Sequence, residues 1–486
     1  MSEKDVYKLF NGIKIDECEV EYISESVSTM QKERIKKNLN KKIKGRRALK
    51  NFKYGVTAAG VGIACVIGVG VTNPSLAENV PVLNSIIQGL NDKYGTTSEY
   101  SDYSKVIGES ITSNGVTFTI NEVLADEAKL IISYTIKSDQ KLNDTASSNA
   151  LSSLKINGKT WGGTGSALGE YVDDYTYIAS EEIDLELATS YKSLKKPKST
   201  EELSLKSIND LNISLKAREL MGIKGKWDFA FSVSKDEISK NTTIFNPNKK
   251  IDFPNSTVNI DKVTFSPLGT YISLNGKYKD RKKDSSIDIF DYGYWLAFDD
   301  NGVELAPKGA GGGSSDSTKF NSQMTYGKLE SIPKHLTIIP CNIIPSGGGG
   351  VTMDSDGKVE SVHEVKTKKP KEHSKLIDGN YPIELSQGRI GKIIVKDIVT
   401  ENGITTVNYT AEGIAPHTQA HSLYVKDDTG NDLIPKTYAI RKSMETPNDF
   451  TITFDALNPN KNYTIYTTDF SNYEIREDLK FNINLK

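Results

Sequence analysis

The sequence predicts a mainly β protein held in a membrane by one helix. A short helical cytosolic segment precedes this helix, and tandem antiparallel β-sandwich (Ig-like) modules follow it. Three observations support the prediction. A basic run leads into a long uncharged segment, one hydrophobic pattern recurs three times further along, and helical periodicity is nearly absent after residue 100.

The membrane helix is predicted at residues 54–73. Residues 41–53 (KKIKGRRALKNFK) carry seven positive charges and no negative one, and the 19 residues that follow them are uncharged and mostly apolar. A 19-residue helix rises about 1.5 Å per residue and so matches the hydrocarbon core of a bilayer. Basic flanks stay in the cytoplasm. We therefore expect residues 1–53 inside the cell and about 410 residues outside it.

Cleavage of this segment is an open alternative. Ser75-Leu76-Ala77 has the small-x-small form that signal peptidase cleaves, after Ala77. The 53 residues ahead of the apolar segment are long for a signal peptide and favour an uncleaved signal anchor. The five glycines between Gly55 and Gly70 disfavour the third reading, a buried helix of a globular domain.

The cytosolic segment, residues 1–53, is expected to bind a partner. Ile35, Leu39 and Ile43 recur every four residues and form one apolar face of a helix. This face docks on a cytosolic protein, or the basic helix lies on anionic lipid instead. About 50 residues hold little core of their own, which favours folding on a partner.

One face of the predicted span carries small residues. Gly60, Ala64 and Gly68 follow one another at four-residue steps, a spacing that lets membrane helices approach closely. Self-association through this face and a glycine-rich span that stays monomeric both remain open. After the span, in the juxtamembrane segment 74–99, residues 80–90 (VPVLNSIIQGL) predict a short amphipathic helix that docks on the first module.

The modules are predicted from a repeat. Four apolar residues stand at offsets 0, 3, 12 and 14 in three places: Ile120, Val123, Ile132 and Tyr134; Ile260, Val263, Ile272 and Leu274; Val395, Ile398, Val407 and Tyr409. Each set indicates a strand, a turn-rich link and a second strand.

A second pattern, an aromatic residue followed by two alternating apolar residues, is expected to close each module. It occurs at Trp227, Phe229 and Phe231; at Tyr381, Ile383 and Leu385; and at Phe481, Ile483 and Leu485. We therefore expect β-sandwiches in series at residues 100–245, 246–388 and 389–486. Residues 179–194 and 199–221 are exceptions that show helical periodicity.

Charge and cysteine content exclude several classes of function. The chain has 61 Lys and Arg against 63 Asp and Glu. Residues 1–53 hold 14 basic and 8 acidic residues, so the part outside is acidic, which argues against nucleic acid as a ligand. Only Cys341 would lie outside, so no disulfide forms there and a bacterium with a single membrane (Gram-positive) is indicated. Zinc sites that need two cysteines are excluded.

Several segments resemble a known family. The basic helix, the span, residues 73–86 (NPSLAENVPVLNSI) and residues 114–136 resemble the bacterial membrane proteins of domain of unknown function 4179. Residues 393–486 resemble the uncharacterised C-terminal domain often paired with it. Such proteins are often encoded beside extracytoplasmic-function sigma factors and are suspected anti-sigma factors. The resemblance implies that residues 1–53 bind a sigma factor. They hold only Cys18 and no histidine, unlike zinc-binding anti-sigma domains, so the contact would be independent of metal.

Candidate sites for chemistry are weak. His417 and His421 stand four apart, as metal ligands on a helix do, but no glutamate lies between them. Residues 299–302 and 354–357 resemble calcium loops without the closing glutamate and are better read as hairpin turns. Tyr171, Tyr175 and Tyr177 predict either sugar stacking or strand packing. Trp161 and Trp295 are expected in cores. We expect no enzyme activity, catalytic residue, cofactor or metal.

The function expected is a membrane-anchored extracytoplasmic sensor or regulator of anti-sigma-factor type, with its N-terminus in the cytoplasm and its modules outside the cell. The alternative is a cell-surface structural, adhesion or ligand-binding protein without a regulatory role. The neighbouring gene, a sigma factor or a wall-assembly gene, would separate these readings. The ligand or stress sensed and the identity of the cytosolic partner do not follow from the sequence.

Overall fold

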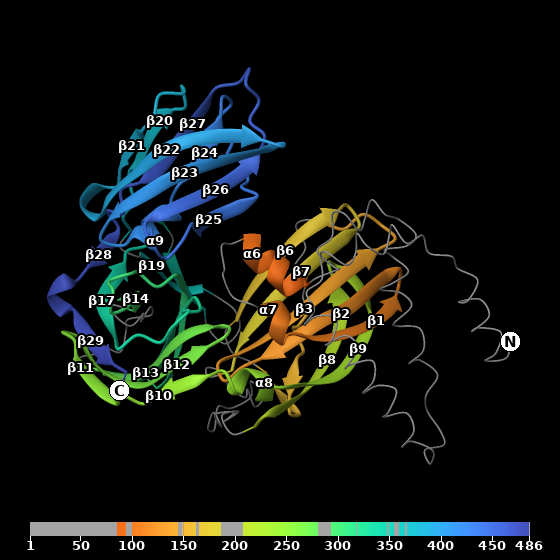
Figure 1. The fold of residues 1–486 in the computed structure, drawn as a ribbon. Coiled ribbons are helices and arrows are strands. Elements are labelled where there is room, and N and C mark those ends of the chain that lie inside the picture. Colours follow the sequence, from red (N-terminus) through yellow and green to blue (C-terminus); the bar gives the residue numbers. More distant parts are fainter. Residues whose placement is uncertain are drawn as a thin grey trace, which may run out of the picture. The chain divides into compact units, whose positions relative to one another are not determined.

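The computed structural model describes residues 85–93, 100–143, 148, 150–161, 165–185, 208–279, 293–316, 318–347, 349–353, 359–364 and 367–485 (Figure 1). The chain divides into two units, 1–61 and 62–486, and every described residue belongs to the second. The predicted cytosolic and membrane segments lie outside the described residues, together with Ile35, Leu39, Ile43, Gly60, Ala64 and Gly68. No helix in the described ranges is long and apolar enough to cross a membrane.

The first module is a sandwich of two antiparallel sheets, with strand orders β1-β2-β3-β7-β6 and β5-β4-β8-β9 (Figure 1). Its strands are β1 (Lys105–Ser113), β2 (Val116–Ala125), β3 (Lys129–Ser138), β4 (Lys155–Ile156), β5 (Lys159–Thr160), β6 (Gly165–Asp173), β7 (Thr176–Asp184), β8 (Asp210–Leu220) and β9 (Ile223–Ser234). Phe118, Tyr134 and Trp227 are the largest side chains of the core between the sheets.

The helical periodicity expected at residues 179–194 and 199–221 is wrong for the parts that the structure describes, which belong to β7 and β8. In β8 every second residue from Leu211 to Ala217 is buried. This period of two, together with pairing to β9, overrides the local helical spacing.

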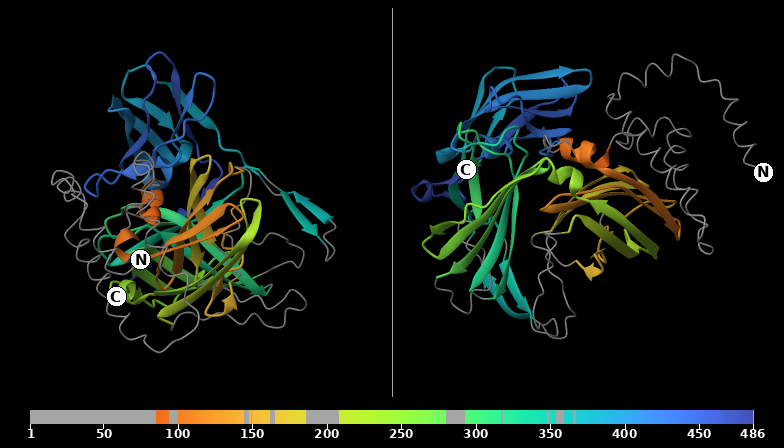
Figure 2. Two further views of the ribbon diagram at one scale, coloured as in Figure 1. Left: turned by 90° about the vertical axis from the view of Figure 1, so that its right-hand side faces the viewer. Right: turned by 60° about the horizontal axis from the view of Figure 1, so that its bottom comes forward.

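The second module has the sheet orders β10-β12-β13-β16-β15, with β11 also paired to β12, and β14-β17-β28, with β29 also paired to β17. The short helix α8 (Asp236–Ser239) leads into it. Its strands are β10 (Thr243–Phe245), β11 (Lys249–Asp252), β12 (Ser256–Ser266), β13 (Gly269–Tyr278), β14 (Tyr294–Phe298), β15 (Pro307–Asp316), β16 (Lys319–Tyr326), β17 (His335–Ile343), β28 (Tyr473–Ile475) and β29 (Phe481–Asn484), with the 3-10 helix η3 (Glu477–Leu479) before β29. A hairpin of β18 (Gly349–Met353) and β19 (Val359–Glu364) forms a separate two-stranded sheet (Figure 2, left).

The third module has the sheet orders β21-β22-β23-β26-β25 and β20-β27-β24. Its elements are β20 (Glu372–Leu376), β21 (Ile383–Ser386), the 3-10 helix η2 (Gly388–Ile390), β22 (Gly391–Glu401), β23 (Ile404–Gly413), α9 (Pro416–Ala420), β24 (Tyr424–Asp427), β25 (Thr437–Arg441), β26 (Asp449–Asp455) and β27 (Tyr463–Thr468). The prediction of a mainly β protein is confirmed: among the described residues, each of the three modules is built from antiparallel sheets.

The repeated pattern forms the central hairpin of each module. In the first, Ile120 pairs with Tyr134 and Val123 with Ile132. The first strand spaces its residues by three and the second by two, so one residue, Asn121, is left over as a β-bulge. Asp261 and Lys396 occupy the same place in the other hairpins. The bulge therefore turns both apolar residues of the first strand to one face.

The serial order of the modules is wrong at the C-terminus. Phe481 and Ile483, expected to close the third module, lie on β29, which pairs with β17 of the second module. Ile483 and Leu485 belong to the second module's core. The boundary at 388/389 also separates β21 from β22, which pair with each other. The third module is thus inserted into the second. Its strands run from β20 to β27, and the chain before and after them (β10–β17, then β28 and β29) forms the second module, which we call the host.

The juxtamembrane helix is confirmed where it is described. Helix α6 (Ile86–Lys93) buries Ile86, Ile87 and Leu90, and the one-turn helix α7 (Tyr100–Tyr103) follows it. Ile86 and Leu90 pack with Ile178 of β7, so the helix lies on the outer face of the first module's larger sheet (Figure 1).

Replacing Ile483 tests the insertion. Ile483→Ala leaves a cavity in the host core, and we expect it to lower the free energy of unfolding by about 2 to 5 kcal/mol. Hydrogen exchange followed by mass spectrometry should show faster exchange in β14 and β17 and unchanged exchange in β22 and β23. The matched control, Ile465→Ala in the third module's core, should give the reverse. Faster exchange of β22 and β23 in Ile483→Ala would contradict the insertion.

Candidate functional site

The juxtamembrane helices are anchored to the first module by a buried carboxylate. Glu122 Oε1 accepts hydrogen bonds from Ser85 Oγ at 2.8 Å and from the backbone N–H of Ile87 at 2.9 Å. Glu122 is 4% exposed and satisfies the free N–H of Ile87, while the Ser85 hydroxyl accepts the next one, from Gln88, at 3.0 Å. The start of α6 is thereby held at the bulge of β2.

The same helices contact the other two modules. Ile87 and Tyr100 share a hydrophobic cluster with Ile238 of α8 and with Leu268 of the β12–β13 turn. Lys308 of β15 donates a hydrogen bond of 2.5 Å to the Tyr100 hydroxyl. Helix α6 also contacts β25 of the third module. We call α6 and α7 together the juxtamembrane hub, because all three modules meet it.

A charged cluster lies beside the hub. Lys129 of β3 pairs with Glu182 of β7. Burial raises the pKa of Glu182, but the charges of Lys129 and Lys308 outweigh it and the net shift is downward. Burial lowers the pKa of Lys308 to about 7 despite the nearby Glu182 carboxylate. The cluster therefore joins the first and second modules by charge as well as by apolar contact.

Two linkers connect the third module to its host, and they run side by side. The backbone N–H of Asp469 donates to the Lys371 carbonyl at 3.0 Å, and the N–H of Lys371 donates to Asp469 Oδ1 at the same distance. Asn472 then bonds through Nδ2 to the Ile344 carbonyl, at 3.1 Å. The inserted module is therefore joined to its host by two linkers that are hydrogen-bonded to each other.

A cavity of about 400 Å³ opens at these linkers. The lining comes from both modules: Tyr294, Pro307, Pro370, His417, Thr418, His421, Ser422, Thr468, Phe470, Asn472 and Tyr473. We call it the junction cavity. The sequence marked only its two histidines, because the rest of the lining comes from segments far apart in the chain.

A buried carboxylate closes the junction beneath this cavity. Glu304 of the host accepts hydrogen bonds from the N–H of His417 at 2.7 Å and from the Thr418 hydroxyl at 2.7 Å. Its backbone carbonyl accepts a hydrogen bond from Arg441 Nη2 of β25, at 2.9 Å. Burial raises the pKa of Glu304 to about 7, although these donors and the Arg441 charge oppose the shift. One residue thus joins the cavity wall to β25.

The histidine-bearing helix α9 is supported by a buried amide network. Gln387 Nε2 donates to the hydroxyls of Ser422 and Thr467, both at 2.8 Å. Gln419 Nε2 donates to Gln387 Oε1 at 2.7 Å, and the N–H of Ala415 donates to Gln419 Oε1 at 3.2 Å. Both glutamines are fully buried. Buried networks whose members are satisfied fix a single conformation.

The metal reading of the histidine pair gains no support. The rings of His417 and His421 stack 4.5 Å apart, and burial lowers the pKa of both. Within the described ranges, no group of three His, Cys, Asp or Glu side chains is placed to hold a metal ion.

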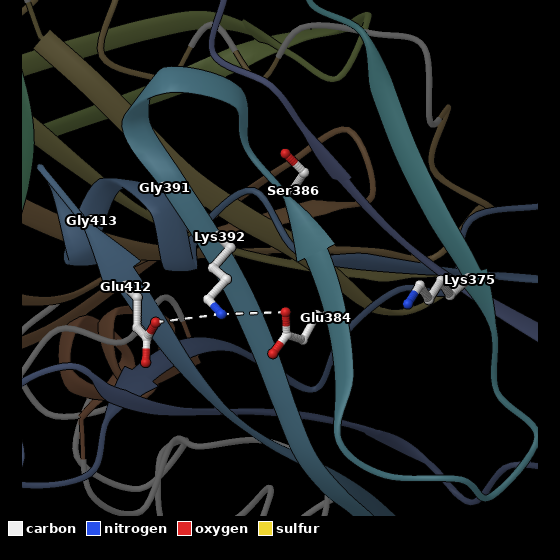
Figure 3. A pocket seen from close by; sticks show the side chains of 7 residues that line it. All are labelled: Lys375, Glu384, Ser386, Gly391, Lys392, Glu412 and Gly413. Atoms are coloured by element: carbon white, nitrogen blue, oxygen red, sulfur yellow. Dashed lines mark hydrogen bonds and ion pairs between the residues drawn. The ribbon is translucent and has the colours of Figure 1, made fainter.

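A second hollow, of about 650 Å³, lies on the outer face of the third module (Figure 3). Lys392 stands between Glu384 and Glu412, with ion-pair distances of 3.2 and 3.8 Å. All three side chains are exposed, and such surface pairs contribute little. We read this hollow as a solvated sheet surface.

Other predicted residues have structural roles. Tyr171 and Tyr177 pack ring to ring at 5.1 Å on the β6–β7 hairpin, and Trp295 is buried in the second core as expected. Asp299 accepts the N–H groups of Asn301 and Val303, which makes residues 299–302 the predicted turn. Cys341 is buried and free. Residues 354–357 lie outside the described residues.

Glu304 makes the stability of the junction depend on pH. Its pKa is raised in the folded state from 4.5 to about 7, so its contribution is complete below pH 4.5 and is lost as pH rises toward 7. Glu304→Gln removes this loss. Calorimetry should show that the free energy of unfolding of the variant, relative to that of the natural protein, rises by about 3 kcal/mol between pH 4.5 and pH 8.

The histidines act in the opposite direction, because lowered histidine pKa values cost stability as pH falls below 6.5. They are present in both proteins and cancel in the difference. If the difference in the free energy of unfolding between the two proteins does not change with pH, Glu304 does not have this role.

Comparisons with known proteins agree with the resemblance seen in the sequence. Residues 47–138 match the model of a domain of unknown function (DUF4179), and residues 242–385 match that of a family of unknown function (DUF5643). The second match covers most of the host module and β20, and so lies ahead of residues 393–486, where the paired domain was expected.

Curated proteins gave no match. Among solved structures, "The crystal structure of the conserved domain protein from Bacillus anthracis" is similar over 55% of this chain and 88% of that chain, with 22% identity and a TM-score of 0.39. The chain thus carries a DUF4179 domain at residues 47–138, which includes the juxtamembrane hub, and a DUF5643 segment at residues 242–385.

Proposed function

We propose that this protein is a membrane-anchored extracytoplasmic sensor and regulator of anti-sigma-factor type. Its β modules lie outside the cell, and residues 1–53 hold a sigma factor inside. The observation that carries the proposal is the juxtamembrane hub. The segment next to the predicted span is packed against all three modules, so a change in the outer modules reaches the membrane.

The junction between host and inserted module supplies a route for such a change. Glu304 contacts the cavity wall through its carboxylate and Arg441 through its carbonyl. Arg441 ends β25, and β25 contacts α6. A rotation of the inserted module about its two linkers would therefore alter the packing of α6.

A surface adhesion role is the second candidate. Tandem sandwiches suit an extended stalk, but a stalk needs no inserted module and no packed juxtamembrane helix. The two candidates differ most clearly in what residues 1–53 bind.

Capture of a sigma factor tests the proposal. We expect the full-length protein, purified in detergent, to retain a sigma factor of its own cell. The triple variant Ile35→Asp, Leu39→Asp and Ile43→Asp places three charges on the apolar face and should reduce capture at least about tenfold, the effect of about 1.4 kcal/mol.

The matched control adds three charges at polar positions of the same segment that lie off this face, Ser26→Asp, Asn38→Asp and Asn40→Asp, and should leave capture unchanged. Failure of the natural protein to retain a sigma factor would refute the anti-sigma reading and favour the adhesion role.

A further inference from the structure

We infer that the junction cavity binds an uncharged saccharide of one or two rings, recognised by aromatic side chains of the host and of the second linker and by neutral polar groups of the inserted module. This inference deepens the proposed sensor function and rests on it for its biological meaning. The binding itself can be measured whether or not a sigma factor is bound.

The size and location of the cavity suit a ligand site. A volume of about 400 Å³ falls within the range of about 300 to 1,000 Å³ that is usual for small-molecule sites, which are frequent between domains. The lining includes Thr468 at the end of β27, Phe470 and Asn472 of the linker that follows it, and Pro370 of the other linker. A ligand there would touch the segments that join the inserted module to its host.

Aromatic rings form the apolar part of the lining. Tyr473 lies 5.0 Å from Phe470 and 6.1 Å from Tyr294, measured between ring centroids, and both contacts are edge to face. A pyranose ring presents an apolar face of C–H groups and a rim of hydroxyls. Aromatic rings pack on such a face, and tyrosine adds a polar handle.

Neutral polar groups form the rest. The lining contributes the hydroxyl of Thr468 and those of Thr418 and Ser422, which also bond to Glu304 and to Gln387. Two buried polar atoms of lining residues, His417 Nδ1 and Asn472 Oδ1, have no hydrogen-bond partner among the described residues. Both atoms are enclosed by protein, so a ligand in the cavity would meet the lining hydroxyls and not these two atoms.

The lining is poorly suited to a charged ligand. None of the described residues that line the cavity is an Asp, Glu, Lys or Arg. His421 donates from Nδ1 to the His417 carbonyl at 2.9 Å. His417 is buried, whereas His421 is exposed to solvent. A charged ligand would lose its hydration there without gaining an opposite charge, so the chemistry favours an uncharged ring.

The wall is built before any ligand arrives. The Gln387–Gln419 network supports α9 from behind, and Glu304 holds its first turn from the host side. A wall fixed in this way lowers the cost of binding.

Titration calorimetry tests the inference on the full-length protein in detergent. The probes are cellobiose and N,N′-diacetylchitobiose, with cellobiuronic acid as the charged counterpart. We expect at least one neutral disaccharide to bind, and the acid to bind at least about tenfold more weakly. Tyr473→Ala should weaken binding of the neutral sugar about tenfold or more, and Tyr473→Phe, which keeps the ring, much less.

Two further variants keep the test decisive. Thr468→Val removes one lining hydroxyl with little change in shape and should also weaken binding, which covers the case in which Tyr473→Ala does not fold. Tyr171→Ala, on the exposed hairpin of the first module, should leave binding unchanged. The inference is overturned if neither neutral sugar binds, if the acid binds equally well, or if Tyr171→Ala abolishes binding while the junction variants do not.

Discussion

The antiparallel pairing of β29 with β17 makes the chain cross twice between the second and third modules. Without this pairing the host would lose Ile483 and Leu485 from its core. The inserted module would then hang from one linker. With it, Lys371 and Asp469 lie hydrogen-bonded to each other, and the junction cavity and the Glu304 contacts follow from that geometry.

The juxtamembrane hub depends on this arrangement as well. Its contacts to the first module are apolar at Ile178 and polar at the two ends of α6, where Glu122 accepts the N–H of Ile87 and Lys93 pairs with Glu170. Its contact with the third module accompanies the packing of the inserted module on the host. That packing uses Glu304 and Arg441 and a buried apolar cluster of Leu296, Phe298, Ile339, Ile390, Ala415 and Phe470. Glu304, whose pKa is raised by burial, is the group of this junction whose contribution to stability falls as the pH rises toward 7.

The hairpins and helix α6 could be predicted from the sequence because they depend on short-range spacing, whereas the contacts of the hub with the second and third modules could not. The offsets of three and two in the repeat even contain the bulge at Asn121, since a regular ladder would space both strands equally. The alternation at Phe481 and Ile483 shows a strand with one buried face, but it carries no information about which sheet that strand joins. Its partner β17 lies more than a hundred residues earlier.

The candidate site was visible only in fragments. His417 and His421 stand out as a pair, yet the spacing suggests a metal, whereas the structure stacks the rings in a neutral wall. In the sequence, nothing distinguishes Glu304 from other acidic residues that follow a turn. Its burial depends on N–H groups 113 residues away, a distance over which local patterns say nothing.

Hydrogen exchange of α6 in the full-length protein tests the central claim, that the juxtamembrane hub responds to the inserted module. Arg441→Ala removes the hydrogen bond to Glu304 and should speed exchange of the amides of residues 90–93 as well as those of β25. Arg389→Ala, an exposed arginine of the same module, should change neither. If Arg441→Ala loosens β25 and leaves α6 as protected as before, the hub does not sense the inserted module and the account is wrong.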